Sequence, residues 1–536
     1  MAAVGEAPTL FLRKATGLVK GWSKFDAFLY SFMSVNFVTL GLFFALSVLA
    51  FVPAGQVLPA LLISGVFITF LVITYAGLIS VMPRAGGDYV WQSRVLTGGI
   101  AFVLAVTGWW FILWYWAPVY GNILNVEVFQ PLAAIFKWDG VLDFLGKDIG
   151  LFTVILITVV LAGFLVSLGM EGYAKVQKYC FYIGFIGLGI MFLVMLFGSR
   201  AGFQSAFDQE ARNLFGVNNA YAQTLKDAGG ANVVPNLGFS PLFGDTLLLI
   251  PFLCFWILWP NWGATLYGEV RGASDFKRVM TGMMYGLWVT IAVALVFLLL
   301  ASKFFGWQWF NSANLNYWSG TGPVPIWSYP PLLVSFYFHN TIVQAIIVLM
   351  FGAWFLGWAG TLFLSSTRVI FAAAFDRILP ERVADVSEKR HVPVWALVLM
   401  LVPSIAVGAF YAYTDKFKDF ILDATLVIAV TFFGSAIAAA ILPWRKKTLY
   451  QNSPIARYKV AGIPLITVSG AITALFLGFN LYQWFTNDNY AVNNSTSLWF
   501  MLGMYVLALV IYVVAKIYRR SQGIDLSAIH REIPVE

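Results

Sequence analysis

The chain has 536 residues, of which 60% are hydrophobic and 11% are charged, and its net charge is +8. Soluble proteins hold about 45–50% apolar and about 25% charged residues, so this composition excludes a set of soluble domains. The 47 Gly, 49 Phe and 21 Trp residues are typical of a multi-pass membrane protein, in which glycines pack helices and tryptophans lie at the interfaces.

Twelve apolar runs are long enough to cross a bilayer, because a spanning helix needs about 20 mainly apolar residues. Their predicted bounds are 27–50, 57–82, 98–125, 150–169, 179–198, 246–268, 279–301, 342–366, 395–413, 420–442, 460–484 and 498–515. We therefore predict an all-α integral membrane protein with a tail at 1–25, a twelve-helix domain at 26–516 and a tail at 517–536. Two long outside loops, 199–245 and 302–341, are expected to form short lids.

The basic residues predict the orientation of these helices. With the N-terminus inside, the inside segments hold 25 of the 33 Lys and Arg residues and the outside loops hold eight. Cytoplasmic loops are enriched in Lys and Arg. The sequence therefore predicts a cell-membrane protein with both termini in the cytoplasm. Asn493 and Asn494 each begin an Asn-x-Ser/Thr triplet, for which chance matches in a polar loop are the preferred interpretation.

Within these bounds no Asp, Glu, Lys or Arg lies in the middle of a span. The nearest ones, all near the ends, are Asp26, Glu127, Asp245, Glu269 and Asp423. A charge at mid-membrane is costly and usually functional. Its absence argues against a voltage sensor and against a proton pump built on a buried carboxylate. It favours a site that binds a zwitterion or a neutral solute through backbone dipoles and aromatic walls.

Two spans carry signs of a break. Helix 6 contains WILWPNWG at 256–263, where Pro260 removes a backbone donor and clashes with the preceding turn. Helix 1 contains SVNFVTLG at 34–41, with four small or polar positions in eight residues. A proline kink and small-residue packing would explain each break alone. Together they resemble the paired broken helices from which secondary transporters build their sites.

The third helix carries an aromatic run, WWFILWYW at 109–116, in which some rings are expected to wall a pocket or contact an ammonium group by cation–π attraction. Trp110 is our candidate from this run, as part of a gate with Pro260 and Gly263. The sequence shows no metal cluster, phosphate loop or catalytic triad. We therefore predict no catalytic residues, no metal, no cofactor and no nucleic-acid partner.

Three inside segments carry a family resemblance: 82–90 (MPRAGGDYV), 269–272 (EVRG) and 368–380 (RVIFAAAFDRILP), with RYKVAGIP at 457–464 as a fourth. Their order and placement resemble the amino acid–polyamine–organocation (APC) permease family over residues 26–516. The resemblance implies an inverted five-plus-five repeat (LeuT-like), with helices 1 and 6 discontinuous. The repeats would cover about 26–198 and 245–442, with helices 11 and 12 at 460–516.

The resemblance also implies a site around the two breaks. The residues expected to bind substrate are Ser34, Asn36, Thr39, Gly41, Phe255, Trp256, Trp259 and Asn261. Arg84, Glu269 and Arg368 are expected to stabilise a cytoplasmic gate. Thr361 and Ser365 on helix 8 are a possible sodium site. Helix 1 departs from the family's Gly-x-Gly pair, since only Gly41 is present. The interior of predicted helix 5 also lacks the lysine of some proton-coupled relatives.

The sequence therefore predicts a permease that imports an amino acid or a related amine by alternating access, as a symporter with H⁺ or Na⁺ or as an exchanger. One alternative is another solute on the same fold, such as a nucleobase, a quaternary amine or an organic anion. A second alternative is a membrane receptor or accessory subunit that does not transport. An enzyme is disfavoured, because no nucleophile, base or metal set lies close together in the sequence.

Overall fold

The computed structural model describes residues 18, 20–229, 237–238 and 244–531. It is 80% helical and holds twelve helices that are long and apolar enough to cross a membrane. The predicted all-α membrane fold is therefore confirmed. Most of the predicted N-terminal tail lies outside the described residues.

The twelve spans keep their predicted order, and most of their bounds agree with the sequence to within a few residues. Spans 1 to 12 are Phe25–Ala45, Val57–Val81, Gly98–Ile135, Asp148–Ser167, Gly169–Phe197, Asp245–Glu269, Phe276–Ser319, Thr341–Phe375, Val394–Tyr413, Ile421–Arg445, Leu465–Thr486 and Ser495–Ser521.

Several spans consist of more than one helix. The first five spans and their loops contain α1 (Lys24–Val35), η1 (Phe37–Ala45), η2 (Leu49–Phe51), α2 (Val57–Val81), α3 (Gly87–Val95), α4 (Gly98–Val106), η3 (Thr107–Phe111), α5 (Ile112–Leu124), η4 (Asn125–Phe129), α6 (Gln130–Ile135), α7 (Asp139–Leu145), α8 (Asp148–Ser167) and α9 (Gly169–Phe197).

The middle of the chain holds spans 6 to 10. Its helices are α10 (Arg200–Phe215), α11 (Ala220–Asp227), α12 (Asp245–Leu248), α13 (Ile250–Ile257), η5 (Trp262–Glu269), α14 (Phe276–Ala301), η6 (Ser302–Gly306), α15 (Trp307–Ser319), α16 (Pro330–Ser335), η7 (Phe336–Phe338), α17 (Thr341–Ala359), α18 (Thr361–Phe375), η8 (Glu381–Ala384), α19 (Val394–Tyr413), α20 (Asp415–Lys418) and α21 (Ile421–Arg445).

The last part holds spans 11 and 12 with short flanking elements. These are α22 (Lys447–Gln451), η9 (Pro454–Arg457), β1 (Lys459–Val460), β2 (Ile463–Pro464), α23 (Leu465–Thr486), η10 (Asp488–Tyr490), α24 (Ser495–Ser521) and α25 (Leu526–Ile529).

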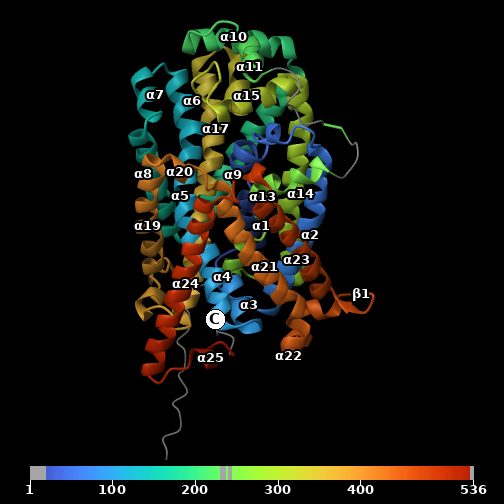
Figure 1. Ribbon diagram of the computed structural model, residues 1–536, viewed down its shortest axis with the longest axis vertical. Helices are drawn as coiled ribbons and strands as arrows, with labels where there is room; N and C mark the ends of the chain where they lie inside the picture. The colour runs from blue at the N-terminus through green and yellow to red at the C-terminus, as the bar shows by residue number, and fades with distance from the viewer. Residues whose placement is uncertain (1–17, 19, 230–236, 239–243, 532–536) are drawn as a thin grey trace, which may run out of the picture.

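The two ends of the molecule differ (Figure 1). One end carries α10, α11 and α15, and the other carries α3, α22, α25 and the β1–β2 hairpin. We name them the outer and inner ends, after the orientation that the basic residues predict. The described parts of the two predicted outside loops contain α10, α11, α15 and α16, and α15 continues the long helical segment of span 7.

Span 11 (α23) begins later than predicted, at Leu465 instead of residue 460. Lys459 pairs with Pro464 and Val460 with Ile463 in an antiparallel hairpin. The two turn residues, Ala461 and Gly462, have φ values of 48° and 82°. Positive φ at both positions is the geometry of a tight hairpin turn, and it stops a helix from starting there.

Other spans are longer than predicted, among them span 7, which runs to Ser319 instead of residue 301, and span 8, which runs to Phe375 instead of 366. Span 3 runs to Ile135 instead of residue 125, and span 5 begins at Gly169 instead of 179. Glu127 therefore lies within span 3, and Lys175 and Lys178 lie within the helix of span 5. Lys178 pairs with Asp26 at 2.7 Å, which joins spans 5 and 1.

Candidate functional site

The first span breaks at Asn36. Helix α1 ends at Val35, and Asn36 takes a left-handed conformation with φ 40°. The side-chain oxygen of Asn36 accepts a hydrogen bond from the backbone N–H of Thr39 at 3.0 Å. Asparagine tolerates this backbone conformation better than most residues. It therefore serves both as the end of one helix and as the cap of the π-helical segment η1 that follows.

The sixth span breaks at Pro260, as predicted. Helix α13 ends at Ile257, and the chain resumes as the 3₁₀ helix η5 at Trp262. A proline cannot donate the helical hydrogen bond and its ring displaces the preceding turn. The indole N–H of Trp259 donates to the carbonyl of Phe255 at 2.6 Å. The break therefore covers residues 258–261, between α13 and η5.

The two breaks lie against each other. The hydroxyl of Ser31 on α1 donates to the carbonyl of Pro260 at 2.8 Å. A Cβ added to Gly41 would lie 3.1 Å from the ring of Trp256, and one added to Gly263 would lie 3.2 Å from the ring of Tyr30. Glycine at these positions allows spans 1 and 6 to approach closely.

A small cavity of about 10 Å³ lies beside the breaks. Its lining residues are Ser34, Leu40, Trp116, Tyr120, Trp259, Trp262, Trp358 and Thr361. They come from spans 1, 3, 6 and 8. Such a volume is about what one water molecule needs, so the aromatic rings close this state of the site. Admission of a solute requires these rings to move.

The predicted site residues are distributed unevenly around this cavity. Ser34, Trp259 and Thr361 line it. The others lie in the surrounding shell: Asn36, Thr39, Gly41, Phe255, Trp256 and Asn261 are all buried beside the breaks. Trp110 points elsewhere, since its indole N–H donates to the carbonyl of Leu399 on α19.

One face of span 3 supplies the walls that the sequence reasoning did not select. Trp109 packs against Trp262 with ring centroids 4.6 Å apart, and Tyr120 stacks on Trp358 at 3.5 Å. Trp116 lies between them in sequence and lines the cavity. Positions 109, 116 and 120 share one helical face. This shared helical face is the signal in the sequence that favours Trp109, Trp116 and Tyr120 over Trp110 as wall residues.

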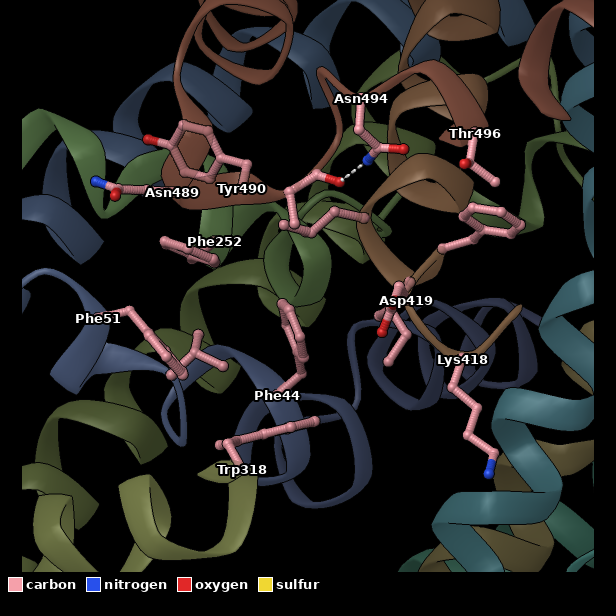
Figure 2. Close-up of a pocket in the computed structure, with 15 residues that line it drawn as sticks. Phe44, Phe51, Phe252, Trp318, Lys418, Asp419, Asn489, Tyr490, Asn494 and Thr496 are labelled. Carbon is pink, nitrogen blue, oxygen red and sulfur yellow. Dashed lines mark hydrogen bonds between the residues drawn. The ribbon is translucent and has the colours of Figure 1, made fainter. Parts of the chain in front are cut away.

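A larger hollow of about 490 Å³ opens at the outer end (Figure 2). Phe44, Phe252, Trp318 and Tyr490 are among its lining residues. Phe44 packs against Phe255 at 4.5 Å between ring centroids, and Phe255 stacks on Trp116 at 5.2 Å. Since Trp116 lines the small cavity, these three rings separate it from the outer hollow.

Several buried polar atoms near the breaks have no hydrogen-bond partner among the described residues. They include Asn36 Nδ2, Thr39 Oγ1, Thr361 Oγ1 and both side-chain amide atoms of Asn261. All four residues are 0% exposed. Buried polar groups are nearly always paired, and each unpaired one costs about 1–3 kcal/mol. Such a concentration is typical of a site whose partners arrive with a ligand or a conformational change.

Span 8 connects to both breaks through Thr361 and Ser365 at the start of α18. The Ser365 hydroxyl lies 2.8 Å from the hydroxyl of Tyr30 and donates to the carbonyl of Trp262 at 3.0 Å. The indole N–H of Trp262 donates to the carbonyl of Thr361 at 3.0 Å. Ser365 is therefore engaged by spans 1 and 6, whereas the Thr361 hydroxyl is one of the unpaired groups.

Two buried ion pairs close the inner end. Arg368 donates to both carboxylate oxygens of Glu269 at 2.7 and 3.0 Å. Arg94 likewise donates to both oxygens of Asp376 at 2.6 and 2.9 Å. The structure thus brings together two of the three predicted gate residues. Arg84 is only partly buried, and it donates to the carbonyl of Pro83.

Asp88 is fully buried and has three hydrogen-bond donors. Tyr75 and Ser435 donate to one oxygen at 2.5 and 2.6 Å, and the indole of Trp109 donates to the other at 3.0 Å. Asp88 is on α3, between spans 2 and 3. Burial raises the pKa of its carboxyl to about 6, against these three donors. The sequence placed Asp88 within a motif but assigned it no role.

Two buried carboxylates lie farther from the breaks. Glu127 on η4 is 1% exposed and Asp423 on α21 is 0% exposed. Neither has a hydrogen-bond partner in the described part of the chain. The predicted third helix ends at residue 125 and leaves Glu127 outside. This prediction is wrong, because the helix continues through Asn125–Phe129 as a π-helical turn. Among the described residues, no group of three or more His, Cys, Asp or Glu lies where it could hold a metal.

Comparison with known proteins identifies one family. The model of the family described as "Amino acid permease" matches residues 11–525 of this chain. A search of curated proteins finds no match.

Proposed function

The chain belongs to the amino acid permease family, and from this premise we propose that it imports an amino acid or a related amine by alternating access. One observation carries the proposal. The broken segments of spans 1 and 6 meet beside a closed aromatic cavity, where buried polar atoms of Asn36, Thr39 and Asn261 have no partner. Paired broken helices near mid-membrane are how secondary transporters bind their substrates.

The parts of the site have distinct roles in this proposal. The polar head of the substrate binds near Ser34, Asn36, Thr39 and Asn261, and its side chain contacts Trp259 and the aromatic wall. Phe44, Phe255 and Trp116 form the outer gate, because their rings, in contact one after another, separate the cavity from the outer hollow. The Glu269–Arg368 pair forms the inner gate. The inner gate faces the cytoplasm of a cell-membrane protein, according to the basic-residue bias.

The coupling ion is part of the proposal as well. Thr361 offers an unpaired hydroxyl to a sodium ion, whereas Ser365 is already engaged by Tyr30 and Trp262. Glu127 offers a proton site, because a buried carboxylate without donors is compatible with the membrane interior only when it carries a proton or meets a cation.

A melting experiment tests the substrate class. The purified protein is heated with single amino acids, decarboxylated amines, nucleobases and organic anions, each at several concentrations. A ligand that binds only the folded state raises the melting temperature with its concentration. We expect amino acids or amines to do so and Asn261→Leu to remove the effect. Stabilisation by nucleobases or organic anions alone would contradict the proposed substrate class.

One observation favours a quaternary amine as the second candidate. Five aromatic side chains line the cavity and none of its lining residues is charged. Such aromatic cages bind quaternary ammonium groups by cation–π attraction. In this case Trp259→Ala should weaken competition by choline or glycine betaine about 10-fold, and competition by amino acids less. An unchanged competition profile in Trp259→Ala would count against any pocket role for this ring.

A further inference from the structure

A cavity of about 660 Å³ opens at the inner end, where spans 3, 10 and 12 meet the C-terminal segment. It lies away from the breaks and from the outer hollow, and it adjoins the inner end through Arg94, whose ion pair with Asp376 is one of the two described above. Its lining contains five cationic side chains and no acidic one: Arg94, Arg445, Lys446, Lys516 and Arg531. Such a set concentrates positive potential in one hollow.

Four of these cations make no close side-chain contact with an acidic group, although Asp525 lies near Lys516 and Arg531. Arg94 is paired with Asp376, but the structure shows no side-chain hydrogen bond or ion pair for Arg445, Lys446, Lys516 or Arg531 among the described residues. Unpaired like charges repel one another. Arg445, Lys516 and Arg531 are exposed to solvent and Lys446 is half-buried. An anion bound between them would lower their mutual repulsion.

The backbone of the cavity adds to its positive character. Gly98 and Gly99 line it and form the first turn of α4, the start of the long span 3. The first N–H groups of a helix have no intrahelical acceptor and carry a partial positive charge. They lie here beside the four unpaired cations and extend the same field.

The pKa of Asp525, two residues before Ser527 of the lining, is affected by the same positive charges. Its carboxylate accepts a hydrogen bond from the backbone N–H of Ser527 at 2.8 Å. That bond, with Arg531 and Lys516 nearby, holds the pKa of Asp525 below its ordinary value.

The position of the cavity matches the edge of a bilayer. Arg445 ends span 10, Lys516 lies in the last turns of span 12, and Gly98 begins span 3. Large apolar side chains beside them are exposed, with Trp444 at 65% and Ile517 at 66%. A headgroup in the cavity would thus place its acyl chains along an apolar surface.

We propose that this cavity binds a phosphate-bearing anion, either the headgroup of an anionic phospholipid or a soluble polyphosphate. The bound anion would hold the C-terminal segment to the inner ends of the spans. His530 on that segment already lies 3.2 Å from the hydroxyl of Tyr89, which donates to Asp376, the partner of Arg94. Occupancy of the cavity therefore stabilises the closed inner end.

Two probes distinguish the sources. Inositol hexakisphosphate, which has no acyl chains, is titrated against the purified protein by calorimetry. Lipid binding is measured by native mass spectrometry on protein from nanodiscs of phosphatidylcholine, with or without 20 mol % phosphatidylglycerol. Binding of either probe supports the proposal and identifies the source, and failure of both overturns it.

A triple variant and a matched control make the test specific. Lys446→Gln/Lys516→Gln/Arg531→Gln removes three cavity cations, whereas Lys447→Gln/Arg457→Gln/Lys459→Gln removes three exposed inner-end cations that do not line it. We expect the first to weaken binding about 10-fold or more and the second less than about 2-fold. Equal losses would show a diffuse surface charge and overturn the site. Binding is read without transport, so the outcome is independent of the proposed substrate.

Discussion

Asn261 is fully buried, yet both atoms of its side-chain amide lack a hydrogen-bond partner within the described structure. Leucine has nearly the same size and no polar atoms, so Asn261→Leu removes the unpaired groups without leaving a hole. If the amide binds the substrate, uptake should fall about 100-fold or more while the protein stays folded.

The matched control is Asn480→Leu on α23. Asn480 is also fully buried, but its amide is paired, since its nitrogen donates to Phe476 and its oxygen accepts from Cys254. Uptake by this variant should remain near the original rate. Normal transport by Asn261→Leu, measured on protein with an unchanged gel-filtration profile, would remove Asn261 from the site.

At the residue scale, the sequence predicted the breaks better than the cavity walls. Asn36 and Pro260 act through the local backbone, which residue type alone controls. Trp116, Tyr120 and Trp358 act through the direction in which each ring points. That direction depends on how spans 3 and 8 are rotated in the bundle. The sequence therefore shows the aromatic run at 109–116 but not which of its rings faces the cavity, and Trp110 is the wrong choice from it.

At the scale of elements, Asp88 joins α2, α3, η3 and α21 through one carboxylate. Its folded-state pKa of about 6 lies above the ordinary value of about 4. The folded state therefore binds more protons between these values, and this contribution to stability declines as the pH rises from about 4 to about 6.

Ser435→Ala removes one donor to this carboxylate, which raises the pKa of Asp88 further. The loss in melting temperature should therefore be larger at pH 8, where the carboxylate is ionised, than at pH 5. The hydrogen bond to the charged form is worth about 1.5–3 kcal/mol and that to the neutral form about 0.5–1.5 kcal/mol. The control Ser469→Ala, whose hydroxyl donates to Ile466 of its own helix, should show equal losses at both pH values. Equal losses for Ser435→Ala would contradict the link to Asp88.

The Glu269–Arg368 pair joins η5 to α18 with both side chains at 1% exposure or less. Removal of one partner leaves an uncompensated buried charge, at a cost of about 3–5 kcal/mol. Arg368→Met and Glu269→Leu should each lower the melting temperature strongly. The double variant should melt above either single one. A double variant that loses the sum of both effects would show that the two side chains act separately.

The elements themselves follow closely from the sequence, because a membrane span is defined by apolar length. Their ends follow less well. Span 11 starts later than predicted because Ala461 and Gly462 form a hairpin turn. Span 3 is longer than predicted because the π-helical turn at Asn125–Phe129 keeps Glu127 inside the protein. Apolar counts detect neither feature.

At the scale of the whole molecule, a closed cavity between spans 1, 3, 6 and 8 lies between two proposed gates of different construction. The proposed outer gate consists of three aromatic rings in contact, and the proposed inner gate of buried ion pairs. Rings can swing aside at small cost, whereas buried ion pairs must be separated or hydrated together. We therefore expect the closed state described here to open more readily toward the outer side.

Uptake into proteoliposomes tests this account most directly. A labelled amino acid mixture is supplied outside, under a proton gradient, a sodium gradient or no gradient, with Asn261→Leu in parallel. The account predicts uptake by the original protein and none by the variant. Accumulation under one gradient would identify the coupling ion, and equilibration without a gradient would indicate an exchanger or uniporter. No uptake of any amino acid or amine by protein shown to be folded would contradict the proposed function.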